Sequence, residues 1–172
     1  MPETRQLTVL EILDRYGSLG PDFLTWLAVH CEEEGFAGTP SEPGLSASVL
    51  GPMVFTSDTG EATKMSLAGD EAAAAPEVLA ALRAGKRLSR ARVQLNAQDA
   101  EWLFTLEAES FDLKSVKLPV PKVPDLDEYM SLRIQALQHL DRLIYELFEK
   151  FLTVRLDPET WKEEAASWRK RR

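Results

Sequence analysis

Cysteine and histidine are scarce in this sequence, and their scarcity excludes several kinds of site. The chain of 172 residues has one cysteine, Cys31, and two histidines. A single cysteine cannot build an internal disulfide framework, and the sequence has no Cys and His spacing typical of a zinc site. We therefore expect no metal, no cofactor and a reducing compartment.

Long apolar runs and phosphate-binding loops are also missing. No apolar stretch approaches the roughly 20 residues that a membrane-spanning helix needs. Residues 1–4 have neither the basic nor the apolar region of a signal peptide. The RAGK of residues 83–86 lacks the spacing of a phosphate-binding loop. These absences predict a cytoplasmic protein that contacts no membrane.

Acidic and basic residues are unevenly distributed along the chain. Residues 1–79 hold 3 Lys and Arg against 13 Asp and Glu, a net charge of −10. Residues 80–172 hold 17 against 15, a net charge of +2, which together with the first half makes the −8 of the whole chain. Any contact with a polyanion must therefore lie in the second half.

The spacing of apolar residues and the helix-capping signals predict the helices. Five helices are expected, over residues 4–16, 20–35, 72–84 and 125–155 and from 157 onward. Residues 37–52, rich in Gly, Pro and Ser, indicate a loop, and Gly20 suits a helix cap.

Alternating apolar residues predict the strands. Strands are expected at residues 53–57 and 63–67, at 90–96 and 101–109, and near 111–118. A tight turn at Gln98 and Asp99 would place every apolar pair of the central hairpin on one face. That register pairs Leu95 with Trp102, Val93 with Phe104, Ala91 with Leu106 and Arg90 with Glu107.

A proline strap at residues 118–124 separates the sheet from the long helix, because its three prolines exclude regular structure. The order α-α-β-β-α-β-β-β-α-α predicts an α+β fold, an antiparallel sheet with flanking helices and a long C-terminal helix after the strap. We expect one domain over 1–172, with helices and sheet in 1–117 and the C-terminal helices in 125–172.

Residues 19–36 are apolar on almost every side of a helix, which indicates a buried helix. His30 and Cys31 point about 100° apart on that helix, so they do not face each other as a base and a thiolate would. Glu32, Glu33 and Glu34 are expected to be a solvated run. No group of residues suggests catalysis, and we expect a protein that is not an enzyme.

Two sets of residues are candidates for binding. Basic residues that could hold phosphates, with a basic C-terminus beside them, are Arg83, Lys86, Arg87, Arg90, Arg92, Lys114 and Lys117. Apolar residues of the long helix that could pair with a partner helix are Leu137, Leu140, Ile144, Leu147 and Phe151. The same apolar stripe is also what a helix covering its own sheet would show.

Several stretches resemble the recombination-associated RdgC family, in particular its C-terminal half and its short divergent bacterial members. GPDFLTWL at residues 20–27 is similar to the family's FLTWL signature, and ALRAGK at 81–86 to its LR-x-GK element. WLFTLEAE at 102–109, followed by Phe111 and Lys117, resembles a third family stretch. FL at 151–152, RL at 155–156 and Trp161 are similar to the closing helices of the family.

The resemblance implies a nucleoid-associated protein that binds double-stranded DNA without sequence preference, acts in recombination and forms a dimer. Those family properties would make the basic residues above phosphate contacts. The alternative is an acidic protein–protein interaction module that has kept the fold without binding DNA. A homodimer or a partner protein is expected in either case.

Overall fold

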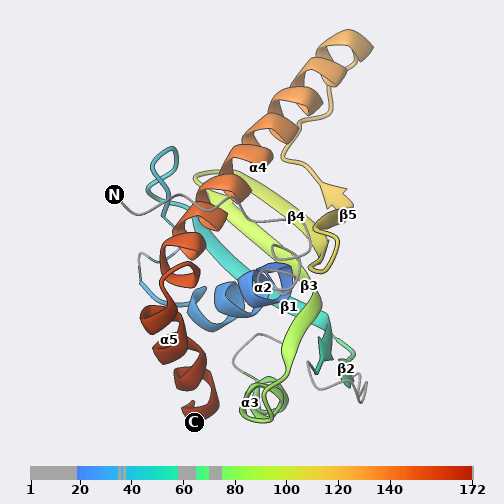
Figure 1. The fold of residues 1–172 in the computed structure, drawn as a ribbon. Helices are drawn as coiled ribbons and strands as arrows, with labels where there is room; N and C mark the ends of the chain where they lie inside the picture. Colours follow the sequence, from blue (N-terminus) through green and yellow to red (C-terminus); the bar gives the residue numbers. More distant parts are fainter. Residues whose placement is uncertain (1–18, 35, 37, 58–64, 70–74, 172) are drawn as a thin grey trace, which may run out of the picture.

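The computed structural model describes residues 19–34, 36, 38–57, 65–69 and 75–171, and it confirms the α+β class (Figure 1). The predicted helix at 4–16 and the turn at 58–60 lie outside these residues. The elements in chain order are α2 (Leu19–His30), β1 (Ser46–Thr56), β2 (Met65–Leu67), α3 (Pro76–Arg83), β3 (Arg87–Ala97), β4 (Ala100–Glu107), β5 (Asp112–Lys117), α4 (Leu126–Arg155) and α5 (Pro158–Lys170).

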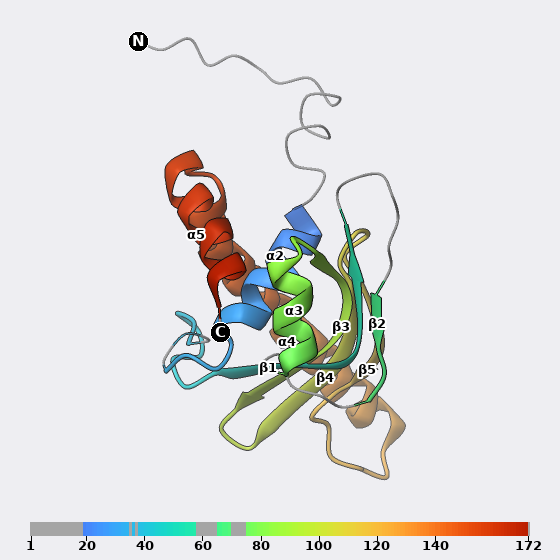
Figure 2. The same cartoon turned by 90° about the horizontal axis from the view of Figure 1, so that it is seen from below.

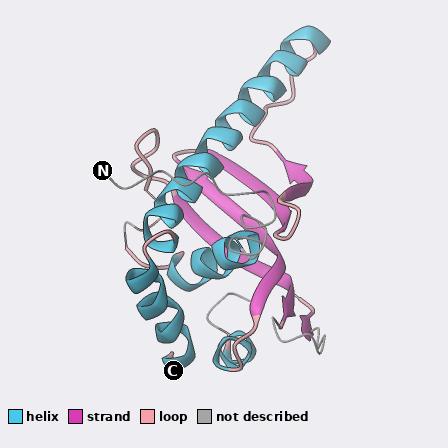
Figure 3. Cartoon of the chain, in the orientation of Figure 1, coloured by secondary structure: helices cyan, strands magenta, loops and turns pink. Residues whose placement is uncertain are grey.

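The five strands form one antiparallel sheet in the order β2-β1-β3-β4-β5 (Figure 3). The predicted hairpin register is confirmed, because Leu95 lies opposite Trp102 and Arg90 lies opposite Glu107. In β3 and β4, buried side chains alternate with more exposed ones. One face of the sheet therefore carries the core, and the other face is polar.

The prediction of a loop over residues 37–52 is wrong for its second half. β1 begins at Ser46, which pairs with Asn96 of β3. Ala47 and Val49 are buried on the core face, so burial against β3 outweighs the loop-like composition. The register shifts between Leu50 and Val54, and this irregularity lets the strand continue through a glycine and a proline.

The helix ends follow local chemistry in most cases. Asp125 and Asp157 cap α4 and α5, each accepting hydrogen bonds from two backbone N–H groups of the first turn. Residues 118–125 contain no helix or strand, as predicted for the strap. α2 is shorter than expected, because it ends at His30 and the chain then makes turns before residue 35.

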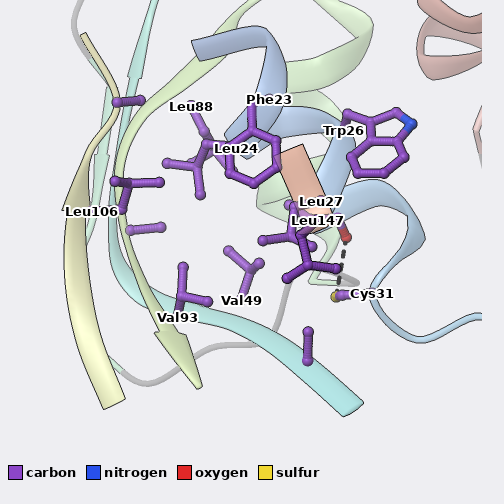
Figure 4. Close-up of a cluster of buried hydrophobic side chains, with 14 of the residues drawn as sticks. Phe23, Leu24, Trp26, Leu27, Cys31, Val49, Leu88, Val93, Leu106 and Leu147 are labelled. Atoms are coloured by element: carbon purple, nitrogen blue, oxygen red, sulfur yellow. Dashed lines mark hydrogen bonds between the residues drawn. The ribbon is translucent and has the colours of Figure 1, made fainter. Parts of the chain in front are cut away.

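The core lies between the sheet and the two helices α2 and α4 (Figure 4). Phe23 and Leu27 of α2, Phe104 of β4 and Leu147 of α4 line a residual cavity of only about 10 Å³. Val93 and Leu95 of β3 also line it, and such a small void means that the four elements are tightly packed. Figure 2 shows α2 on the inner side of the curved sheet.

Gly20 is a packing residue of α2 and not the helix cap that the sequence suggests. A Cβ atom at this position would lie 1.6 Å from the carbonyl oxygen of Ala108. The absence of a side chain lets α2 approach the end of β4, so the glycine sets the distance between the helix and the sheet.

Candidate nucleic-acid interface

Arg87, one of the predicted phosphate contacts, lies inside the fold. Its Nε atom donates to Asp22 Oδ1 at 3.2 Å, and Arg155 Nε donates to Asp22 Oδ2 at 3.1 Å. The Arg87 guanidinium also lies 4.7 Å from the ring centroid of Trp168. Arg87 therefore stabilises the packing of α2, β3, α4 and α5, and we remove it from the candidate surface.

Arg83 and Lys86 lie where α3 and α5 end side by side (Figure 1). Arg83 Nε donates to the backbone oxygen of Arg171 at 2.7 Å. A Cβ atom on Gly85 would lie 3.4 Å from Nη2 of Arg169. We call these five cations the basic cluster: Arg83, Lys86, Arg169, Lys170 and Arg171.

Two helix C-termini meet in the basic cluster. α3 ends at Arg83 and α5 at Lys170, and the partial negative charge of a helix C-terminus favours nearby cations. Arg83, Arg169 and Lys170 are exposed, whereas Lys86 and Arg171 are half-buried. The fold thus gathers positive charge from two distant segments on one accessible surface.

The other predicted cations lie on the polar face of the sheet. In β3, Arg90 and Arg92 alternate with core residues. In β5, Lys114 pairs with Thr105 and Lys117 pairs with Leu103, and both of these β4 residues lie on the same polar face. The predicted cations on this face are therefore Arg90, Arg92, Lys114 and Lys117.

Glu107 reduces the positive charge of that face. Its carboxylate forms an ion pair with Arg90, as predicted, and Lys114 Nζ lies 3.4 Å from the same Oε1 atom. The aromatic residues of the five strands, Phe55, Trp102 and Phe104, are buried on the core face. The polar face can contact phosphates but offers no ring on which a base could stack.

The predicted partner stripe of the long helix is largely a core stripe. Leu140, Leu147 and Phe151 are buried within the chain, and Ile144 packs against the same core. Only Leu137 is exposed. The prediction of a partner interface is therefore wrong for the three buried residues, because their side of α4 covers its own sheet.

The predicted partner stripe does not include three exposed apolar residues of α4. Leu126, Met130 and Ile134 precede Leu137 at helical spacing, and all four are exposed. The signal was present as a second apolar line beside Arg133. It was obscured because the periodicity alone does not say where α4 leaves the sheet.

His30 forms a polar bridge between α2 and α5. Its Nδ1 atom lies 2.7 Å from Glu33 Oε1, and its Nε2 atom contacts the carboxylate of Glu164. Trp168 Nε1 donates to Glu164 at 2.8 Å. Burial opposes the charge of His30, but the two glutamates outweigh it and raise the pKa of His30.

Cys31 is buried, as predicted, and its Sγ atom donates to the backbone oxygen of Ala28 at 3.4 Å. Burial raises the pKa of the thiol, which disfavours the reactive thiolate. Among the described residues, no three metal-binding side chains are grouped, and no helix is long and apolar enough to cross a bilayer.

The sequence matches no family model and no curated protein. The resemblance to the RdgC family therefore stays a prediction, carried by the sequence stretches alone.

Proposed function

We propose that this protein is a non-enzymatic, RdgC-like protein of the nucleoid that binds double-stranded DNA without sequence preference and acts in recombination. The observation that carries the proposal is the basic cluster, where α3 and the end of α5 bring five cations together. Lys and Arg side chains bind phosphates through charge and counterion release, and this binding reads no sequence.

The surroundings of the cluster support binding in spite of the acidic composition. Glu164 of α5 is engaged by His30 and Trp168, so its carboxylate is already partnered within the fold. The cations on the polar face of the sheet could add phosphate contacts. The aromatic rings of the strands are buried, so the strands offer no exposed ring on which a base of single-stranded DNA could stack. We therefore favour the duplex backbone as the ligand.

The experiment is a measurement of duplex binding against salt for the wild type and for the triple variant Arg83→Ala, Lys86→Ala and Lys170→Ala. The slope of log K against log salt should become shallower by about 2–3, because each lost phosphate contact removes about 0.9. Arg87 is left intact, because its loss would disturb the ion pair with Asp22.

Lys122→Ala is the matched control, because Lys122 is an exposed lysine of the strap. It should leave both the affinity and the salt slope unchanged. Two results would contradict the proposed surface: a wild-type affinity that does not change with salt concentration, or a triple variant that binds as tightly as the wild type.

An acidic interaction module without DNA binding is the second candidate. The exposed Glu32 and Glu34 after α2 and the exposed apolar residues of α4 favour it. It predicts no duplex binding at low salt and a stoichiometric protein partner in a pull-down.

A further inference from the structure

A cavity of about 300 Å³ lies where four distant segments meet: the loop before β1, the turn between β3 and β4, the strap, and the first half of α4. Figure 1 shows the strap running beside that half of the helix. The volume is at the small end of the range of about 300–1,000 Å³ for ligand pockets, which suits a single side chain. Polar side chains come from Glu42, Gln98, Gln135 and His139, and part of the apolar wall from Pro119 and Pro121.

The carboxylate of Glu42 is held in place at this cavity. Its backbone N–H donates to Thr39 Oγ1 at 3.1 Å, and its carbonyl oxygen accepts from the N–H groups of Thr39 at 3.0 Å and Leu45 at 3.1 Å. On the side chain, His139 Nε2 lies 3.2 Å from Oε1. The described residues place no partner on Oε2, so that oxygen can accept from a ligand.

The wall beside Glu42 is also fixed. Trp102 is buried, and its Nε1 atom donates to the backbone oxygen of Ala136 at 3.2 Å. The ring of His139 packs edge to face on Trp102 with 4.9 Å between the centroids. His139 is therefore held between Trp102 and Glu42, and a wall that is already ordered lowers the entropy cost of binding.

The charge of the lining favours a cation. Glu42 contributes a carboxylate, and none of the described residues that line the cavity is lysine or arginine. Asp99 lies in the turn beside Gln98, Glu101 follows it, and both acidic residues are exposed. Lys122 of the strap is exposed and is not among the lining residues. A nucleotide or another phosphate compound would find no cation on these walls, so we exclude that class.

Among cations, the walls suit a guanidinium better than an ammonium. A guanidinium is planar and weakly hydrated, and it places two parallel N–H groups on the two oxygens of one carboxylate. An ammonium is strongly hydrated and needs three acceptors around one nitrogen. A single carboxylate with amide oxygens from Gln98 and Gln135, between flat proline walls, matches the guanidinium.

We propose that this cavity binds the guanidinium group of an arginine side chain from a partner polypeptide. Glu42 accepts the paired N–H groups, and Pro119 and Pro121 pack against the methylene stem. A polypeptide is the source because free arginine would bring its own carboxylate close to the acidic residues Glu42, Asp99 and Glu101. Within a polypeptide that group is an uncharged amide.

The inference goes beyond the proposed binding of DNA and does not depend on it. The cavity includes Gln98, which follows the end of β3, whereas the basic cluster includes Lys86, which precedes its start. Its test contains no DNA, so the failure of one proposal leaves the other intact.

The experiment is a calorimetric titration of the full chain with the peptide acetyl-Gly-Arg-Gly-amide. Saturable binding to one site is expected, together with a shift of the Trp102 indole N–H signal in NMR spectra, because this group lies in the cavity wall. The same peptide with lysine in place of arginine should bind at least about tenfold more weakly, and so should free arginine.

Glu42→Gln should weaken binding of the arginine peptide at least about tenfold, because it removes the charge-assisted hydrogen bonds. Glu101→Gln is the matched control: it removes an exposed carboxylate outside the lining and should change the affinity by less than about twofold. Gln135→Glu, on an exposed side chain of the lining, should tighten binding by adding a second carboxylate.

Three results would overturn the guanidinium site: no saturable binding of the arginine peptide, equal affinity for the lysine peptide, or a folded Glu42→Gln variant that binds as the wild type does. Unchanged or weaker binding by Gln135→Glu would contradict it as well, and this variant serves even if Glu42→Gln fails to fold. Free arginine that binds as tightly as the peptide would overturn the polypeptide as the source.

Discussion

Arg155 and Asp22 connect the last turn of α4 to the first turn of α2: Arg155 Nε donates to Asp22 Oδ2 at 3.1 Å across 133 residues of sequence. The other carboxylate oxygen accepts from Arg87 of β3. Asp22 is only 4% exposed, so one carboxylate holds three elements together from inside the protein.

Asp22→Ala should lower the free energy of unfolding by about 3–5 kcal/mol, because it leaves two largely buried guanidinium groups without their carboxylate. Urea unfolding of the variant and the wild type measures the loss. Glu32→Ala removes an exposed carboxylate and should change stability by less than about 0.5 kcal/mol. Equal stability of the Asp22 variant and the wild type would show that the pairs contribute nothing.

Gly20→Ala should destabilise the protein by about 3 kcal/mol, because the new methyl group would overlap the carbonyl oxygen of Ala108. The helix would have to move away from β4 and open its contact with the sheet. Gly44→Ala is the control, since a Cβ atom there meets nothing within 4 Å. The idea fails if the two alanine variants unfold at the same urea concentration.

Phe23→Ala and Trp26→Ala should each cost about 3–5 kcal/mol, because both side chains are buried and truncation leaves a cavity. Phe23 packs at ring-centroid distances of 5.4–5.7 Å against Phe111, Phe148 and Phe151. A thermal melt records the loss. Leu156→Ala, on an exposed side chain, should leave the melting temperature nearly unchanged.

Stability should depend on pH through His30. The ordinary pKa of 6.5 is raised in the folded protein, so the stabilisation by the charged imidazole is complete below pH 6.5 and is lost as the pH rises through the folded value. The pKa of Glu164 is lowered from 4.5, because His30 and Trp168 outweigh its burial, so its contribution is lost as acid protonates it. The bridge is therefore strongest between about pH 4.5 and 6.5.

Urea unfolding at pH 6 and pH 8.5 tests this dependence. His30→Gln should reduce the difference in stability between the two pH values. A difference that survives the loss of His30 would assign the pH dependence to another group.

Much of the fold was predictable because the deciding interactions are local. The hairpin of β3 and β4 was expected in its correct register, since alternation in two adjacent segments leaves one arrangement that buries Val93 with Phe104. The caps Asp125 and Asp157 act on backbone groups two and three residues away. Cys31 was expected in the core because its helix is apolar on almost every side.

The first half of β1 and the role of Gly20 were not predictable in this way. Ser46 is in a strand because Asn96, fifty residues later, pairs with it, while its own neighbours suggest a loop. Gly20 is required by a carbonyl group of Ala108, and no pattern around residue 20 reports that contact.

The candidate surfaces depended most on tertiary structure. Sequence alone identified the cations and the long apolar helix, because charge and periodicity are properties of the chain itself. Only the fold decided that Arg87 pairs with Asp22, that Arg83 meets Arg171 across 88 residues, and that Leu126 stays outside the core. The reason is that burial and pairing are set by which distant segments come together, and composition does not encode those contacts.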